Sequence, residues 1–350
     1  MYTNALSTQI DQTLRQEALT YELNTDNKLV HDKVCARVEA DVETSKVLIE
    51  DPEWMARLPA LTDITNAKSG DVEPLMLERQ LGTKNVTMSY LKFAMPVTKR
   101  DIDNFRRKIP GTANVVDPKI SAMRRLVNMA KGIKEKHFIT TINTSGSYKT
   151  GHAFSLSAGD RWDEAANDPG EDFQTYADAL QLGGGGLTDL IANPYALQRI
   201  YNNPYIKSRM HGSITSAVQV ASPLADQAFA AAYLNGGKVY RADGIYHVGE
   251  KGASSPTGLT RMIKDDVIFC HNSLDTTGLA PGEAPRTFMT MLVDPEVQML
   301  LYTVPFRWGR GGEVDGYYVV LEDSFGLFYA PDTVSNNKIN LGVLVQDCVS

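Results

Sequence analysis

The chain has 350 residues, of which 43% are hydrophobic and 22% are charged, and its formal net charge is −7 at pH 7. This composition is typical of a globular protein that buries one large core or two smaller ones, and it excludes an intrinsically disordered chain. The negative net charge argues against a protein that reads a DNA sequence.

The first residues carry no basic stretch followed by an apolar one, so we expect no secretory signal. The most apolar run, 228–234, is far shorter than the ~20 residues that cross a bilayer, so no membrane segment is predicted. Cys35, Cys270 and Cys348 lie far apart and form no Cys-x-x-Cys pair. This spacing favours buried, inert thiols in a reducing compartment over disulfides or a zinc site.

Residues 1–60 are polar and acidic, with eleven Asp and Glu against six Lys and Arg. The apolar positions between 29 and 48 are spaced for a helix rather than for a strand. The residues leave two interpretations open. One is a solvated amphipathic helix, and the other is an arm that packs on a neighbouring subunit.

Residues 70–98 predict two strands around a turn at 82–85. Apolar side chains stand at even positions up to Tyr90 and at odd positions from Leu91 onward, which indicates a bulge or a hairpin covered on both faces. A two-stranded ribbon alone is barely stable in water, so this ribbon needs a surface to lie on.

Asp117 and Pro118 begin the longest predicted helix, which ends near His137 and spans ~30 Å. Between residues 99 and 136 there are eleven Lys and Arg against four Asp and Glu. Because the whole chain is acidic, we interpret this basic region as a contact for acidic segments of neighbouring copies or of an assembly partner, rather than for DNA. Residues 139–143 are predicted to form a strand.

Residues 157–210 contain the most informative local pattern of the chain. Trp162 lies in a polar, turn-prone loop as a large apolar anchor. A helix is predicted to follow, with an apolar stripe from Phe173 to Leu180, and four glycines at 183–186 end it. Two Asn-Pro pairs, at 193–194 and 203–204, each predict a capped short helix.

The second half mixes helix and strand without a βαβ rhythm, which predicts the α+β class. Ser222 and Pro223 begin a predicted helix that continues to about Asn235. The predicted strands are 238–241, 245–248, 267–271, 288–293, 297–304, 317–321, 325–329 and 341–345.

A search for chemistry finds no phosphate loop, HExxH, dinucleotide fingerprint or GxSxG. Ser89 and Lys92, together with the Lys-Thr-Gly at 149–151, imitate two motifs of serine acyl-transferases, so a cytosolic serine hydrolase is the alternative from another class. Ser89 stands in a strand pattern, whereas the nucleophilic serine of those enzymes begins a helix. The histidines are dispersed. The loop carboxylates Asp160, Asp163, Glu164 and Asp168 surround Arg161 and are explained by capping as well as by a cation. No catalytic, cofactor-binding or metal-binding residue is predicted, and no enzyme activity is expected.

The order Gly-Asp-Arg-Trp-Asp at 159–163, Asn-Asp-Pro at 167–169, a helix, and Asn-Pro-Tyr-Ile-Lys-Ser-Arg at 203–209 resembles the central region of tailed-bacteriophage major capsid proteins. These proteins have the Hong Kong 97-like fold. The resemblance extends loosely over residues 60–330, and Gly170 stands where the family favours an aliphatic residue.

The resemblance implies an N-terminal arm, an extended loop, a peripheral domain with a long spine helix, an axial domain and a C-terminal tail that returns to the peripheral domain. These correspond to residues 1–65, 66–105, 106–185 with the helix at 118–137, 186–330 and 331–350. The implied function is self-assembly into hexamers and pentamers of an icosahedral virion shell around double-stranded DNA, with assembly in the host cytoplasm. Scaffolding, portal and cement proteins are the implied partners. An encapsulin-like bacterial compartment is the alternative within the same fold.

Overall fold

The computed structural model describes residues 29–39, 44–50, 81–106, 117–182, 186–210, 223–247, 259–272, 287–306, 315–329 and 338–350. Its helices are α2 (His31–Val34), α5 (Lys99–Arg106), α6 (Pro118–Ile142), α7 (Pro169–Leu182), α8 (Pro194–Asn202), α9 (Pro204–Arg209) and α11 (Pro223–Tyr233), with a 3-10 turn at Ser145–Ser147. The strands in the first half of the chain are β1 (Ala36–Glu39), β2 (Thr44–Glu50), β3 (Leu81–Thr87), β4 (Ser89–Thr98) and β5 (Ala153–Ser155). Those in the second half are β6 (Asp189–Ala192), β7 (Lys238–Arg241), β8 (Ile245–His247), β9 (Leu259–Arg261), β10 (Val267–Cys270), β11 (Thr290–Val293), β12 (Leu300–Phe306), β13 (Gly316–Phe328) and β14 (Gly342–Gln346).

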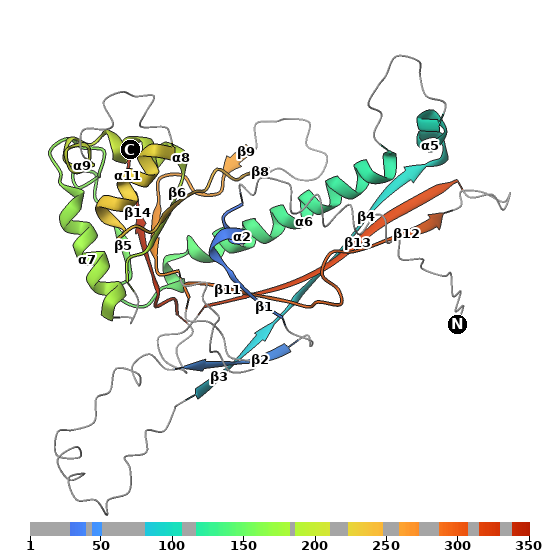
Figure 1. Cartoon of the computed structure of the whole chain (residues 1–350), viewed down its shortest axis with the longest axis horizontal. Helices are drawn as coiled ribbons and strands as arrows, with labels where there is room; N and C mark the ends of the chain where they lie inside the picture. Colours follow the sequence, from blue (N-terminus) through green and yellow to red (C-terminus); the bar gives the residue numbers. More distant parts are fainter. Residues whose placement is uncertain are drawn as a thin grey trace, which may run out of the picture.

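The long helix α6 and a long sheet form the extended part of the molecule (Figure 1). The sheet has the order β1-β11-β13-β12, and β4 pairs antiparallel with β13 along its whole length. The carboxylate of Asp117 caps α6 by accepting the Lys119 N–H at 2.8 Å, and Pro118 occupies the first turn. The first half of the helix buries an apolar stripe, which includes Met123, Leu126 and Val127, against β4, β12 and β13.

A second, compact part lies at the other end of α6 and is built on a sheet of order β5-β14-β10-β6-β7 (Figure 1). Alternate residues of its strands enter different cores, because successive side chains of a strand point to opposite faces. Phe269 of β10 packs with α7, α8, α9 and α11 on one face, whereas Ile268 packs on the other.

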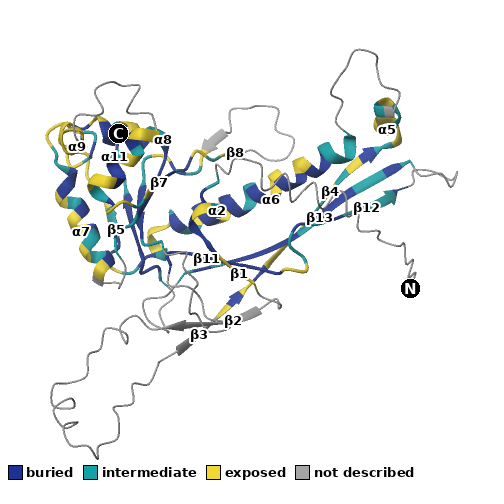
Figure 2. Ribbon diagram, in the orientation of Figure 1, coloured by how far each residue is buried: buried dark blue, intermediate teal, exposed yellow. Residues whose placement is uncertain are grey.

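The second half of α6 covers that other face. Phe138, Ile139 and Ile142 are buried there together with Val30 and Val34 of the N-terminal segment. One helix thus supplies side chains to the core of the extended part and to that of the compact part, as the buried stretches along its length in Figure 2 show.

Residues 81–98 form strands as predicted, but the predicted two-stranded ribbon with a turn at 82–85 is wrong, because β3 pairs with β2 and β4 pairs with β13. Residues 82–85 lie inside β3, which pairs antiparallel with β2, from Thr44 opposite Thr87 to Glu50 opposite Leu81. The segment that connects these two strands, 51–80, lies outside the described residues. The chain passes from β3 to β4 at Met88, shortly before the change of apolar parity predicted between Tyr90 and Leu91.

Three further predictions of secondary structure are wrong. The helix expected between 29 and 48 is a single turn followed by β1 and β2, because β1 gains a parallel partner in β11 far along the chain. The strand expected at 139–143 is the end of α6, where the hydroxyls of Thr140 and Thr141 bond back to the carbonyls of Lys136 and His137. The strands expected at 317–321 and 325–329 are one strand, β13.

The boundaries of the five segments implied by the resemblance stay predictions. The two sheets combine strands from several of these segments. In the extended part β13 pairs with β4, whereas β14 lies between β5 and β10 in the compact part. Residues 1–28 and 330–337 lie outside the described residues, as do Ser222 and the glycines 183–185.

Candidate functional site

Trp162 is the anchor of the compact part, as the sequence predicts. Its side chain is fully buried, and its indole N–H donates to a carboxylate oxygen of Asp172 on α7 at 2.8 Å. Its ring meets Phe173 edge-on at a centroid distance of 5.1 Å and Phe269 at 6.1 Å. The loop around it therefore ties α7 to the central strand β10.

Asn203 holds the same loop from the other side. Its side-chain amide donates to the backbone carbonyls of Trp162, Glu164 and Asn167 at 3.0 to 3.1 Å. Its side-chain oxygen accepts the N–H of Tyr205 at 2.9 Å, which is the predicted cap of α9. Asn193 caps α8 in the same way, also as predicted.

Replacing Asn203 by alanine is expected to lower the free energy of unfolding by about 1–3 kcal/mol, because the helix cap is lost and buried carbonyls lose their donor. Urea unfolding followed by circular dichroism measures the change. The neighbouring, exposed Asn202→Ala is the matched control and is expected to change stability by less than about 0.5 kcal/mol. Equal effects of the two substitutions would contradict the role of Asn203.

Two carboxylates of the loop 160–168 are engaged by arginines, and one of them also by Ser350. Asp163 pairs with Arg199 at 2.7 Å and accepts from the N–H and hydroxyl of Ser350. Burial works to raise the pKa of Asp163, but these hydrogen bonds outweigh it and hold the pKa below its usual value. Asp168 pairs with Arg209 at 2.7 Å. No group of three metal-ligating side chains occurs among the described residues.

Gly170 stands where the capsid-protein pattern favours an aliphatic residue, and its surroundings explain the difference. A Cβ at this position would stand 1.8 Å from a guanidinium nitrogen of Arg209 and 3.0 Å from an oxygen of Asp168. The glycine thus leaves the space through which Arg209 reaches Asp168.

The helix α6 carries two adjacent buried charges that meet different elements. Lys134 lies 2.6 Å from a carboxylate oxygen of the fully buried Asp323 on β13. Glu135 accepts the N–H groups of Val30 and His31 at 3.0 Å and contacts the His31 Nδ1 at 2.6 Å. The N-terminal segment is therefore fastened to α6 through a single carboxylate.

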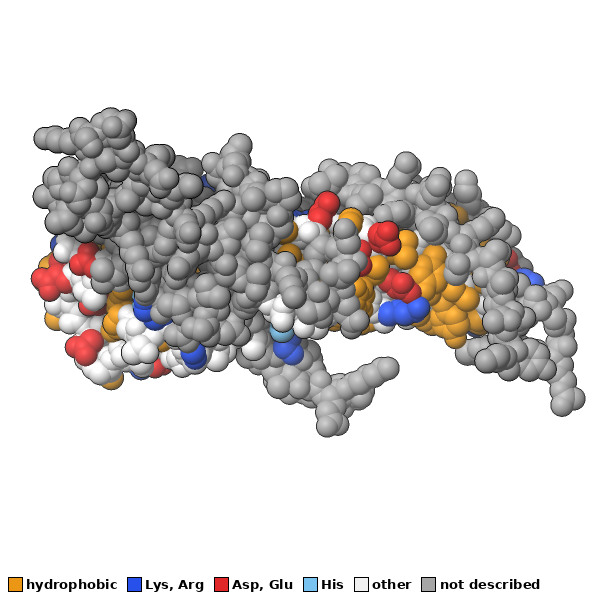
Figure 3. All heavy atoms as spheres, turned by 90° about the horizontal axis from the view of Figure 1, so that it is seen from below, with side chains coloured by type: hydrophobic (Ala, Val, Ile, Leu, Met, Phe, Trp, Pro, Cys, Tyr) orange, Lys and Arg blue, Asp and Glu red, His pale blue; other side chains and the backbone are white. Residues whose placement is uncertain are grey.

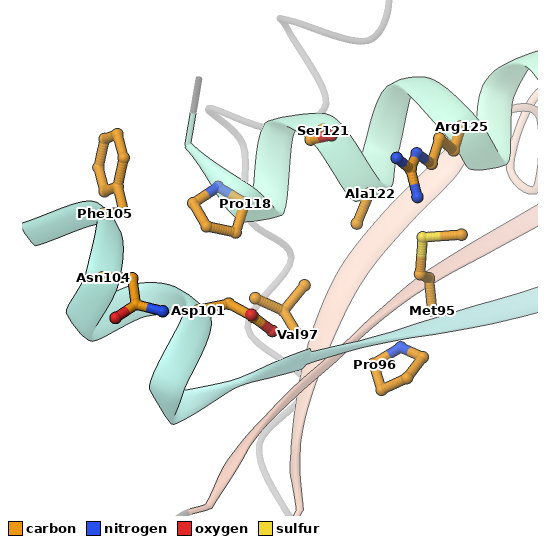
Figure 4. A pocket seen from close by; sticks show the side chains of 10 residues that line it. All are labelled: Met95, Pro96, Val97, Asp101, Asn104, Phe105, Pro118, Ser121, Ala122 and Arg125. Carbon is orange, nitrogen blue, oxygen red and sulfur yellow. The ribbon is translucent and has the colours of Figure 1, made fainter. Parts of the chain in front are cut away.

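The far end of α6 borders a groove with a volume of about 470 Å³. Figure 4 shows its floor, formed by Met95 and Val97 of β4, between a wall from α5 and a wall from α6. Phe105 stands on the α5 side and Arg125 on the α6 side. The groove thus combines these apolar side chains with the polar groups of Asp101, Asn104, Ser121 and Arg125.

The residues of the hydrolase alternative lie on a strand, in an arrangement unlike that of a serine enzyme. Ser89 and Lys92 are three positions apart on β4 and so belong to opposite faces of the sheet. Lys92 pairs with Glu322, and its hydrogen bonds to Glu322 and Tyr302 raise the pKa of its ammonium group. A lysine held in its charged form is a poor general base. The Lys-Thr-Gly at 149–151 precedes β5 in the other sheet.

The three cysteines are buried and free, as predicted, and burial raises the pKa of each thiol. His271 accepts from or donates to Gly186, and His152 contacts the carbonyl of Gly342, so both serve local structure. Trp308 lies outside the described residues. In the part of the chain that the structure describes, no helix is long and apolar enough to span a membrane.

No protein-family model matches the sequence, and no curated protein matches it either. Solved structures do resemble the chain. A phage-related protein from Bordetella bronchiseptica RB50 gives a TM-score of 0.64 at 15% identity and covers 98% of both chains. The SrpI encapsulin complex of Synechococcus elongatus PCC 7942 gives a TM-score of 0.50 at 11% identity, over 90% of this chain and 86% of that one.

These similarities define the class of fold. The chain has the α+β architecture of capsid-like proteins, in which helices and two sheets mix without a regular repeat. More particularly, it shares its fold with a phage-related protein over 98% of both chains and with an encapsulin over 90% of this chain. At identities this low the similarity concerns the fold alone.

Proposed function

We propose that this chain is the major capsid protein of a tailed bacteriophage, which assembles into hexamers and pentamers of an icosahedral shell around double-stranded DNA. The observation that carries the proposal is the similarity over 98% of both chains to a phage-related protein. The resemblance of residues 157–210 to the capsid pattern supports it independently, because it was drawn from residue order alone.

The shape of the molecule suits a shell, which is held together by many modest interfaces. One face of the extended sheet is covered by α6, and the opposite face of β4, β12 and β13 carries Ala94, Pro96, Val304 and Tyr318. Hydrophobic side chains gather over this part of the molecule on the right of Figure 3. An apolar face of this kind is typical of a contact between subunits.

The remaining features of the proposal follow from a shell role. The first partner is the chain itself, and scaffolding, portal and cement proteins are further partners. The protein would reside in the virion after assembly in the host cytoplasm, close to packaged DNA but without reading its sequence. We assign it no catalytic activity, cofactor or metal.

An encapsulin-like compartment is the second candidate, because an encapsulin complex shares the fold over 90% of this chain. The two candidates differ in what the shell encloses. Particles purified from the native source would contain double-stranded DNA in the first case and a protein cargo in the second, and nuclease digestion with mass spectrometry distinguishes them.

Sedimentation velocity of the purified recombinant chain, with negative-stain microscopy of the fast fraction, tests the shell role. Closed particles, or rings of five and six subunits, are expected. A strictly monomeric protein, even when concentrated and co-expressed with its genomic neighbours, would overturn the proposal.

A further inference from the structure

The N-terminal segment 29–39 is held on α6 by a cluster of buried charged side chains. One carboxylate oxygen of Glu135 accepts the N–H of Val30 at 3.0 Å. The other accepts the N–H of His31 at 3.0 Å and contacts the Nδ1 of the same residue at 2.6 Å. Figure 1 shows α2, the turn that carries His31, beside α6. The carboxylate of Glu135 thus receives three contacts from this segment.

A second carboxylate stands on the other side of the His31 ring. Nε2 of His31 lies 3.3 Å from Oδ1 of Asp32, and both side chains are buried. The same oxygen of Asp32 pairs with Arg37 at 2.6 Å, whereas Oδ2 is buried without a hydrogen-bond partner among the described residues. The imidazole ring therefore has a carboxylate oxygen near each of its two nitrogens.

This arrangement fits an imidazolium better than a neutral imidazole. A neutral ring carries one N–H and one lone pair, whereas the imidazolium carries two N–H groups. The contact of 2.6 Å with Glu135 requires a proton on Nδ1. In a neutral ring, the lone pair of Nε2 would then face the carboxylate of Asp32. Such an unfavourable contact costs more inside a protein than in water, because the local dielectric constant is lower.

The titratable groups buried nearby leave His31 as the one that changes its charge near neutral pH. Burial raises the pKa of the Cys35 thiol, and the charges of Glu135 and Asp32 raise it further. Burial also raises the pKa of the other hydroxyl and thiol groups that line this core, which are those of Tyr148, Tyr240 and Cys270. Histidine, by contrast, ordinarily gains or loses its proton between about pH 5 and pH 8.

Further charged side chains surround the segment on three sides. The segment itself carries Lys33 and Arg37, and α6 carries a lysine within one turn of Glu135 on either side of the ladder, Lys131 and Lys134. Across a cavity of about 310 Å³, which Val30 and Lys33 also line, the compact part presents Asp226, Arg241 and Asp243. Arg241 is already paired with Asp226 at 2.7 Å. Of all these groups, only Glu135 and Asp32 are placed against the imidazole nitrogens.

We propose that His31 is a pH-sensitive latch between the N-terminal segment and α6. As an imidazolium it bridges the carboxylates of Glu135 and Asp32, and it releases the segment when it loses its proton. The attraction is thus present at acidic pH and is lost as the pH rises through the range in which imidazole deprotonates. Residues 1–28 join the subunit at this segment, so the latch governs where they leave its body. The inference goes beyond the proposed function and concerns the single subunit.

Hydrogen exchange of the full-length protein, measured by mass spectrometry on the peptide that covers 29–39, tests the latch at about pH 6 and about pH 8. Exchange is corrected for its intrinsic dependence on pH. The protection of this peptide in the wild type is then expected to fall about tenfold between the lower and the higher pH. The peptide that covers β10 reports on the compact core, and its protection is expected to change less than about twofold.

Two substitutions separate the charge of His31 from its packing. His31→Asn keeps a donor for Glu135 but cannot be charged, so low protection is expected at both pH values. Asp32→Asn offers an N–H to the lone pair of a neutral ring, so the segment is expected to stay protected at both. The lost pair with Arg37 contributes little, because the arginine is exposed. His137→Asn, at an exposed position of α6, is the matched control and should keep the wild-type pH dependence.

Three outcomes would overturn the latch. The first is protection of 29–39 in the wild type that does not fall as the pH rises. The second is a His31→Asn protein that keeps the wild-type pH dependence. The third is an Asp32→Asn protein that loses protection at the higher pH as the wild type does, because the second carboxylate is the stated cause of release. Exchange reports on the subunit itself, so a chain that never forms shells would contradict the proposed function without deciding the fate of the latch.

Discussion

The Trp162→Ala protein is expected to lose about 3–5 kcal/mol of unfolding free energy, which is the cost of removing a large aromatic side chain from a packed core. Trp162 is fully buried, and its ring contacts Phe173, Tyr176 and Phe269. Truncation also removes the donor that satisfies Asp172, whose carboxylate lies 2.8 Å from the indole nitrogen. Both effects act on the same core, so the expected loss of unfolding free energy is among the largest for a single substitution.

Urea unfolding followed by circular dichroism and by tyrosine fluorescence measures this loss. Met129→Ala is the matched control, because Met129 is a large apolar residue that is 48% exposed, and it should change stability by less than about 0.5 kcal/mol. Trp162→Phe keeps a ring but no N–H, and an intermediate loss is expected. A loss below about 1 kcal/mol in Trp162→Ala would show that the anchor is not needed.

Replacing Lys134 by methionine is expected to cost a similar amount, about 3–5 kcal/mol, for an electrostatic reason. Asp323 is fully buried on β13, and the Lys134 ammonium at 2.6 Å supplies its counter-charge. A buried carboxylate without a partner is strongly destabilising, whereas removing both charges together is far less costly. The Lys134→Met, Asp323→Asn double variant should therefore be more stable than Lys134→Met alone.

The double-mutant cycle is measured by thermal and urea unfolding at pH 7. Lys136→Met on the exposed side of the same helix controls for the change from lysine to methionine. If the double variant were less stable than Lys134→Met, the ion pair would not be the cause of the loss.

Local signals account for the parts of the fold that the sequence predicts well. The caps of α8 and α9 are correct because Asn193 and Asn203 bond to N–H groups two or three residues away. The anchor role of Trp162 is correct because a tryptophan in a polar loop needs an apolar environment. These signals depend on neighbours along the chain, which a sequence displays directly.

Elements whose partners are remote could not be predicted in the same way. The segment at 36–39 becomes a strand only because β11, about 250 residues later, lies beside it. In β13 the polar run Glu322, Asp323 and Ser324 reads as a break between two strands, yet Lys134 neutralises its buried charge. The clamp of Glu135 on the N-terminal segment likewise joins residues 104 and 105 positions apart.

The groove could not be predicted from the sequence either, because its lining combines the consecutive elements β4 and α5 with α6, which packs beside them only in the folded chain. In the sequence, only the excess of positive charge between residues 99 and 136 distinguishes the region that borders the groove. Composition thus indicates only the positive charge of this stretch, and the packing of the elements forms the groove beside it.

Because α6 contributes side chains to two hydrophobic cores, it affects how the chain unfolds. Met123 and Val127 belong to the core of the extended part, and Phe138 and Ile142 to that beside the compact sheet. Neither core can open without exposing apolar surface on a helix that the other still needs. We therefore expect the two parts to be energetically coupled through α6 and to unfold in one cooperative transition.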